Sequence, residues 1–156
     1  MPTTTEFEHL LREAALRVTR PRLAVLAAVH AHPHADTEAV LTAVRRDAGD
    51  VSHQAVYDGL ATLTAAGLVR RIQPMGSLAR YEARIGDNHH HLVCRSCGAI
   101  VDVDCAVGEA PCLTAADDAG FAIDEAEVIY WGRCPTCAAR DQQLFEDDRE
   151  ERNTRA

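Results

Sequence analysis

The sequence of 156 residues contains no lysine, and all 16 of its basic residues are arginine. It has few aromatic residues, 4%, although 47% of the chain is hydrophobic and 26% is charged, so collagen-like, low-complexity and disordered classes are excluded. No apolar run reaches about 18 residues, so we expect no transmembrane helix. The segment Met1 to Glu8 has no basic or apolar stretch. We therefore expect no secretory signal and a cytoplasmic protein of one domain, or of two small ones.

The net charge of −8 is spread unevenly along the chain. Up to Arg84 there are ten arginines against nine acidic residues, whereas from Ile85 onward there are six against fifteen. Binding to nucleic acid depends on where the charges lie, so the first half could present a local basic face although the whole chain is acidic.

The first 85 residues have the helical periodicity of a small α-helical domain. Apolar residues recur at helical spacing in three segments, which are residues 6–16, residues 21–30 and a segment that Asp36 or Thr37 could cap. Ser52 is a good N-cap for a fourth helix over residues 53–66, which Gly67 would end.

Two strand-like runs, residues 68–73 and 78–83, follow the fourth helix and are joined by Pro74-Met-Gly-Ser77, which has the composition of a turn. Helices followed by a hairpin are the order of a winged helix-turn-helix, in which the fourth helix enters the major groove and the hairpin lies beside the backbone. The alternative is a small α+β domain whose polar helix faces are merely solvated. We expect residues 1–85 to be the winged-helix DNA-binding domain.

From Gly86 the composition shifts to histidine, cysteine and acidic residues. Strand-like runs at 99–103 and 126–131 flank a short helical stretch at 113–119. We expect an α+β chain in which residues 86–138 form a second, C-terminal α/β domain. Residues 139–156 are charged and have almost no apolar residues, so we expect a frayed helix or a disordered tail.

Four of the six cysteines form two C-x-x-C pairs, Cys94-Arg-Ser-Cys97 and Cys134-Pro-Thr-Cys137. Two such pairs can close a tetrahedral structural Zn(II) site, with a strand-helix-strand unit in the 36 residues between them. A thioredoxin-like redox pair is the alternative, although no βαβ pattern surrounds either motif. The other two cysteines, Cys105 and Cys112, have two interpretations. They are either small buried apolar residues or thiols that sense oxidation.

Three consecutive histidines follow Asp87-Asn. In a strand His89 and His91 point to one face and His90 to the other, so one face offers two imidazoles to a single ion. A solvated loop is the alternative interpretation. We group with them the other residues that could act as ligands, which are His32, His34, Glu82 and Asp102. Imidazole and carboxylate ligands without sulfur suit Fe(II), Mn(II) or Zn(II).

Several strings of the sequence resemble the ferric uptake regulator family of metal-dependent repressors, over residues 7 to 138. These are Arg17-Val-Thr-Arg-Pro-Arg22, Ser52-x-x-Ala-Val-Tyr57, His89-x-His91-x-x-Cys94-x-x-Cys97-Gly and the second cysteine pair. Longer strings resemble the redox-responsive branch that represses catalase-peroxidase genes, namely Asp87-Asn-His-His-His, Asp104-Cys-Ala-Val-Gly-Glu-Ala-Pro-Cys112 and Glu125-Ala-Glu-Val-Ile-Tyr-Trp-Gly.

The resemblance implies a homodimer that binds double-stranded operator DNA and has residues 86–138 as its metal-binding dimerisation domain. We expect no membrane and no small-molecule substrate as partners. It implies structural zinc at the four cysteines of the two pairs. It also implies a regulatory Fe(II) or Mn(II) whose ligands come from both domains, namely His34, Glu82, His89, His91 and Asp102. By resemblance Tyr57 touches base edges, Ser52, His53 and Gln54 lie nearby, and Arg17 and Arg20 are candidates for phosphate or minor-groove contacts.

The sequence departs from the family pattern at two places. A second metal site around His90 and Glu109 lacks histidines where this chain has Ala126 and Asn88. The fourth helix has Asp58 where arginine is common, and an acidic residue repels phosphate, so Asp58 either avoids the backbone or reads a cytosine amine.

The expected function is a metal-dependent, redox- or peroxide-responsive repressor of catalase-peroxidase and other oxidative-stress genes, and not an enzyme. An iron-responsive repressor of iron-uptake genes is the alternative in the same class. A thiol oxidoreductase that uses the second cysteine pair, and a zinc-stapled interaction module, are alternatives in other classes. Sensing by oxidation of His34 or His89, and sensing by cysteine oxidation, both stay open.

Overall fold

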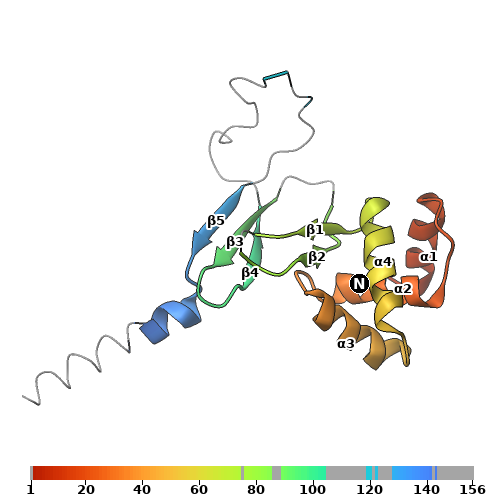
Figure 1. Ribbon diagram of the computed structural model, residues 1–156, viewed down its shortest axis with the longest axis horizontal. Helices are drawn as coiled ribbons and strands as arrows, with labels where there is room; N and C mark the ends of the chain where they lie inside the picture. Colours follow the sequence, from red (N-terminus) through yellow and green to blue (C-terminus); the bar gives the residue numbers. More distant parts are fainter. Residues whose placement is uncertain are drawn as a thin grey trace, which may run out of the picture. The chain divides into compact units, whose positions relative to one another are not determined.

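The computed structural model describes residues 2–74, 76–85, 89–104, 119–120, 122, 128–141 and 143 (Figure 1). The chain divides into two compact units, with the division between Asp87 and Asn88. The sequence-based boundary, between residues 85 and 86, lies two residues earlier. We refer to the two parts as the N-terminal unit and the C-terminal unit, and describe each by itself.

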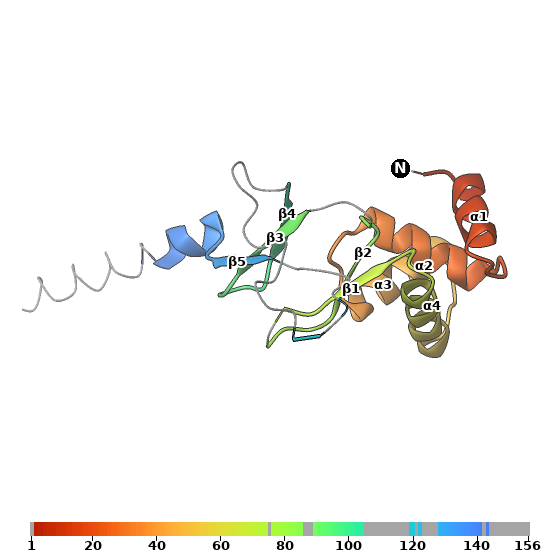
Figure 2. The same ribbon diagram turned by 90° about the horizontal axis from the view of Figure 1, so that it is seen from above.

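The N-terminal unit begins with four helices. Their bounds are α1 (Thr4–Glu13), α2 (Arg20–Ala31), α3 (Thr37–Ala48) and α4 (His53–Ala65), as Figures 1 and 2 show. Each helix is preceded by a side chain that accepts a hydrogen bond from a backbone N–H in the first turn, and these N-caps are Thr3, Thr19, Asp36 and Ser52. The predicted caps at Asp36 and Ser52 are confirmed.

The first helix differs most from its predicted range of 6–16. It begins earlier because Thr3 and Glu6 form a capping box, in which each side chain bonds the other's backbone N–H. It ends earlier because Ala15 has φ +54°, a left-handed conformation that stops the helix, and the N–H of Leu16 bonds back to Leu11.

Helix α2 lies at the centre of the apolar core and packs against α1, α3 and α4. Gly59 allows the close approach of α4, because a Cβ at this position would lie 3.1 Å from a methyl carbon of Val25. Apolar side chains of all four helices form the core, among them Leu11, Val25, Leu26, Val29, Val40, Leu41, Val44, Val56, Leu60 and Leu63. In α2 the sequence pattern predicts that Leu23, Leu26 and Ala27 repeat along the apolar face, but Leu23 and Ala27 are only partly buried, whereas Val25 and Val29 are fully buried.

The two strands after α4 form the predicted hairpin. Strands β1 (Arg70–Ile72) and β2 (Arg80–Glu82) pair antiparallel, with Arg70 opposite Glu82. Both strands are shorter than the predicted strand-like runs, 68–73 and 78–83. The turn between them is closed by a hydrogen bond from the Ser77 N–H to the Pro74 carbonyl, at 2.9 Å. Four helices followed by this hairpin are the winged helix-turn-helix order that the sequence predicts.

The described part of the C-terminal unit is a three-stranded sheet. Strands β3 (His90–Cys94), β4 (Ile100–Val103) and β5 (Ile129–Gly132) lie in the order β4-β3-β5, with β3 antiparallel to β4 and parallel to β5. The helix predicted at 113–119 lies outside the described residues except for Ala119, which is in a turn.

Residues 135–141 are helical, and so is residue 143. The first residues of the predicted tail therefore belong to a helix, which Arg133 supports through an ion pair with Asp141. The remainder of the tail, from residue 144, lies outside the described residues.

Candidate metal centres and nucleic-acid interface

The fold of the C-terminal unit brings the two C-x-x-C pairs together. Cys94 ends β3 and Cys134 follows β5, and these strands are parallel neighbours with Cys94 opposite Gly132. The Arg95 N–H donates to the Gly132 carbonyl at 2.8 Å, which continues the pairing past the strand ends. Because neighbouring parallel strands end at the same edge of a sheet, two motifs that are distant in sequence meet there.

The four thiols of this cysteine cluster fit a tetrahedral zinc ion. The sulfurs of Cys94, Cys97, Cys134 and Cys137 all lie within 4.8 Å of one another, and no disulfide joins them. The Cys97 and Cys134 sulfurs are 3.8 Å apart. Zinc–sulfur bonds of about 2.3 Å place the sulfurs of a tetrahedral site about 3.8 Å apart. The cluster therefore has the geometry of a structural zinc site.

The electrostatics of the cluster also favour a cation. The backbone N–H of Cys134 donates to the Cys94 sulfur at 3.3 Å, and with the N–H of Cys97 it lowers the pKa of the Cys94 thiol to about 6. Hydrogen bonding to the Cys134 thiol, burial and the other two thiols raise the pKa of Cys137 to about 12. Crowding of like groups is relieved when a divalent ion binds them as thiolates.

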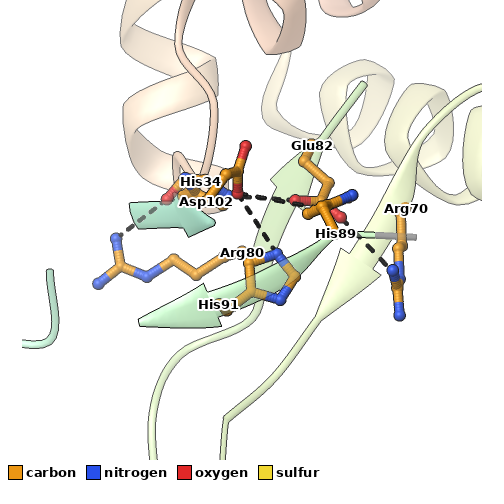
Figure 3. Close-up of polar contacts among 7 residues, drawn as sticks. All are labelled: His34, Arg70, Arg80, Glu82, His89, His91 and Asp102. Atoms are coloured by element: carbon orange, nitrogen blue, oxygen red, sulfur yellow. Dashed lines mark hydrogen bonds and ion pairs between the residues drawn. The ribbon is translucent and has the colours of Figure 1, made fainter. Parts of the chain in front are cut away.

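A second group of potential ligands lies on one face of the same sheet. The rings of His89 and His91 are 4.9 Å apart between centroids, as expected for residues on the same side of a strand. Asp102 lies opposite His91 on β4, and one of its carboxylate oxygens is 3.5 Å from His91 Nε2 and 3.9 Å from His89 Nε2. Figure 3 shows both ion pairs. His90 contacts Tyr130 instead, with ring centroids 6.2 Å apart.

The N-terminal unit contains a pair of potential metal ligands, His34 and Glu82. His34 Nε2 lies 3.1 Å from a carboxylate oxygen of Glu82 (Figure 3). The turn after α2 is joined to β2 at this point, because the His34 N–H donates to the Tyr81 carbonyl at 2.9 Å and Ala35 bridges to Tyr81. His32, which the sequence groups with His34, is an exposed C-cap of α2 and is not part of this pair.

Two arginines that no sequence pattern indicated lie beside the His34–Glu82 pair. Arg80 donates to the His34 carbonyl at 3.4 Å and lies 3.7 Å from Asp36, while Arg70 lies 3.9 Å from Glu82 (Figure 3). His34 has φ +61°, an unusual conformation for a residue other than glycine, and the Arg80 contact helps to hold it. The antiparallel register that sets Arg70 opposite Glu82 became visible only in the structure.

The exposed face of α4 carries the residues predicted to meet DNA. Ser52 caps the helix, while His53, Gln54 and Tyr57 are exposed, and the rings of His53 and Tyr57 stack with centroids 6.3 Å apart. Tyr57 keeps 49% of its surface accessible, so its ring can be reached from solvent. This face is open to a partner.

The two arginines predicted to meet DNA have different surroundings. Arg20 donates to the Ala48 carbonyl at the C-terminal end of α3, so it caps that helix and contributes to the fold. Arg17 is exposed, and its carbonyl accepts a hydrogen bond from the guanidinium of Arg22 at 2.6 Å. Arg17 is therefore the better placed of the two to reach phosphate.

Comparison with known proteins agrees with this architecture. The model of the ferric uptake regulator family matches residues 13–131. The transcriptional regulator FurA of Mycobacterium tuberculosis is 69% identical over 141 residues, covering 90% of this chain and 96% of that protein. Ferric uptake regulation protein 1 of Mycolicibacterium fortuitum is 69% identical over 142 residues, covering 91% of this chain and 87% of that protein.

Solved structures show the same fold. The ferric uptake regulator of Pseudomonas aeruginosa with manganese superposes with a TM-score of 0.60 at 27% identity, covering 80% of this chain and 95% of that one.

A winged helix-turn-helix unit followed by a small sheet with a four-cysteine cluster defines a class of metal-responsive transcription regulators. The chain belongs to the ferric uptake regulator family, as the sequence resemblance predicted. Members of this family are transcription factors that bind DNA as dimers, and not enzymes. In the described part of the chain, no helix has the length and apolar character needed to cross a membrane.

Proposed function

We propose that this regulator is a metal-dependent, redox- or peroxide-responsive repressor that binds operator DNA as a homodimer and controls catalase-peroxidase and other oxidative-stress genes. The observation that carries the proposal is the pair of ligand groups, His34 with Glu82 and His89 with His91 and Asp102. Their donors are nitrogen and oxygen without sulfur, a set that suits Fe(II) or Mn(II).

In this proposal all five residues ligate one regulatory metal. The cysteine cluster serves a different purpose, since its four thiolates would retain structural Zn(II) and keep the fold. Because the ligands would come from both units, the arrangement of the units would depend on whether the metal is bound. Binding would then select the arrangement in which two α4 helices of a dimer fit successive major grooves, about one DNA turn apart.

The five residues would hold Fe(II) with its imidazole ligands close by, and Fe(II) when bound would supply a one-electron reductant of peroxide. Oxidation of His34 or His89 would remove a ligand and release the operator. The competing possibility is that peroxide oxidises cysteines, either in the cluster or at Cys105 and Cys112, which lie outside the described residues. Mn(II) keeps the ligand geometry but is a poor reductant of peroxide, so it separates the two mechanisms.

An exposed apolar face of the C-terminal unit supports dimerisation. Leu92 and Val101 are paired across β3 and β4, and they keep 44% and 57% of their surfaces accessible. Leu92 also lies opposite Tyr130 on β5, so the apolar side chains extend over the sheet. A second copy of the chain would cover this face and bury it.

The test is operator binding by fluorescence anisotropy at fixed salt, comparing Fe(II)-loaded with Mn(II)-loaded protein during a titration with hydrogen peroxide. Release of DNA from the Fe(II) form alone supports metal-directed histidine oxidation. Equal release from both forms supports cysteine sensing. Retention of DNA by both forms at every peroxide concentration contradicts a peroxide-responsive repressor.

An iron-responsive repressor of iron-uptake genes is the second candidate, favoured by the similarity to ferric uptake regulation protein 1 of Mycolicibacterium fortuitum. It uses the same ligands, and differs in the signal. In that case Fe(II) at the concentrations of an iron-replete cell would be required for DNA binding, and peroxide at fixed metal would not release it.

A further inference from the structure

The exposed face of α4 is organised as two side-chain pairs, each separated by one helical turn. His53 stacks on Tyr57, and the Gln54 amide nitrogen donates to a carboxylate oxygen of Asp58 at 2.8 Å. Both pairs have the i, i+4 spacing at which side chains of a helix meet. All four residues are exposed, so the pairs stand on the surface that faces a partner.

The contact with Asp58 fixes which way the Gln54 amide points. An ionised carboxylate only accepts hydrogen bonds, so it selects the orientation in which the amide NH2 group faces it and the amide oxygen points away. One N–H of Gln54 is used by Asp58. The second N–H and the amide oxygen take no part in this contact, and the side chain lies on the exposed face of the helix.

An amide with one donor and one acceptor in the same plane matches adenine in the major groove. Adenine offers N7 as an acceptor and its N6 amino group as a donor, and glutamine binds both at once. Residues near the N-terminus of a recognition helix contact base edges, and Gln54 is the second residue of α4. Asp58 lies one turn further along the helix.

We propose that Asp58 is a positioning residue which orients Gln54 to read an adenine in each half-site of the operator. This inference rests on the proposed DNA-binding function and assigns its base specificity. It also accounts for an acidic residue on a helix that approaches DNA, because the carboxylate acts on a neighbouring side chain and not on the phosphates. Helix α4 contains no arginine or lysine, so its base contacts depend on neutral groups of this kind.

The experiment is a selection of duplexes from a randomised library by the full-length protein loaded with Zn(II) and Mn(II), followed by sequencing. Wild type is compared with Gln54→Ala, Asp58→Asn and Asp58→Glu. Asparagine presents either an acceptor or a donor, so Asp58→Asn leaves the Gln54 amide able to adopt both orientations. Asp58→Glu keeps a carboxylate and therefore keeps the selection of one orientation. Asp50→Asn is the control, because it removes the same charge from the exposed segment just before α4.

We expect wild type and Asp50→Asn to prefer adenine at one position of each half-site by about 5- to 100-fold over other bases. Gln54→Ala and Asp58→Asn should both reduce that preference to about 2-fold or less, and Asp58→Glu should largely restore it. The base preferences at other positions should not change. A merely structural role of Asp58 would instead change the preferences at every position.

Three outcomes would overturn the inference while the proposed function stands. These are an unchanged adenine preference in Gln54→Ala, a loss of preference in Gln54→Ala but not in Asp58→Asn, and a cytosine preference that Asp58→Asn alone removes. The last would mean that Asp58 reads a cytosine amine directly. If wild type enriches no sequence with metal bound, the proposed function fails, and the inference fails with it.

Discussion

Each of the two units of this regulator has its own means of internal stabilisation. The described apolar core lies in the N-terminal unit, where Leu11, Leu26 and Leu63 are fully buried among four helices. In the described part of the C-terminal unit, Val93 is buried beside Cys94 and Cys137, while Leu92 and Val101 stay exposed. Small domains with little apolar core depend on a metal or another cross-link. We therefore expect the stability of the N-terminal unit to depend on apolar burial and that of the C-terminal unit to depend on its cysteine cluster.

The largest expected effect is the loss of the cysteine cluster. Cys97→Ser removes one of four zinc ligands, and structural zinc in small domains contributes about 10–16 kcal/mol of apparent folding free energy. The C-terminal unit should unfold and lose its zinc while the N-terminal unit stays folded, which zinc stoichiometry and limited proteolysis would measure. Ser96→Ala, between the same cysteines, is the control and should behave as wild type. A zinc-loaded, protease-resistant Cys97→Ser protein would refute the structural role.

The converse change acts on the N-terminal unit. Leu26→Ala leaves a cavity at a fully buried position of α2 and should lower the free energy of unfolding of this unit by about 2–5 kcal/mol. Zinc content should be unchanged. Leu78→Ala, at a residue that is 66% exposed, should change stability by about 0.5 kcal/mol or less. Thermal unfolding followed by circular dichroism measures both, and equal effects of the two substitutions would argue against the core assigned to α2.

Acidity should weaken the C-terminal unit through zinc affinity. The pKa of Cys137 is raised to about 12, so this thiol is protonated at pH 7 and zinc must displace its proton, whereas the pKa of Cys94 is lowered to about 6 and its thiol is then largely ionised. Each proton displaced changes zinc affinity about tenfold per pH unit. Affinity should therefore fall as pH falls, and more steeply once pH drops below about 6. Competition with a chromophoric chelator would measure it, and a flat profile would contradict the thiolate assignment.

The smallest effects distinguish the two arginines of the N-terminal unit. Arg20→Ala should cost about 1 kcal/mol of stability, because it removes the side chain that caps α3. Arg17→Ala should leave stability unchanged but reduce the slope of log affinity against log salt by about 1, as expected for one phosphate contact. Urea unfolding measures the stability of both variants, and operator binding at several salt concentrations measures their salt slopes. A stability loss in Arg17→Ala together with a reduced salt slope in Arg20→Ala would reverse the two assignments.

Much of the fold could be predicted from local sequence. The helices followed from apolar spacing and from the caps Asp36 and Ser52, and the shared face of His89 and His91 followed from strand alternation. In the N-terminal unit only the ends of the predicted elements moved, as at α1, where a capping box with Glu6 decides the start.

Long-range pairings could not be predicted in this way. The C-x-x-C motifs indicated zinc, but the parallel pairing of β3 with β5 that joins them depends on contacts between distant segments. The Arg20 guanidinium bonds a carbonyl of another helix, and Arg80 bonds the His34 turn. Such contacts carry no local periodicity, so no local pattern indicates the bond of Arg20 to α3 or that of Arg80 to the His34 turn. The pair formed by Gln54 and Asp58 is local, and its i, i+4 spacing could have revealed it.

The central claim is that the two sets of ligands have separate tasks, zinc for the fold and a second metal for DNA binding. Its most direct test is a titration of zinc-loaded wild type and His89→Ala with Mn(II), followed by operator anisotropy at fixed salt. We expect both proteins to be folded zinc-containing dimers, and Mn(II) to raise the operator affinity of wild type alone. Tight operator binding by the zinc-only protein, or an equal response of His89→Ala to Mn(II), would contradict it.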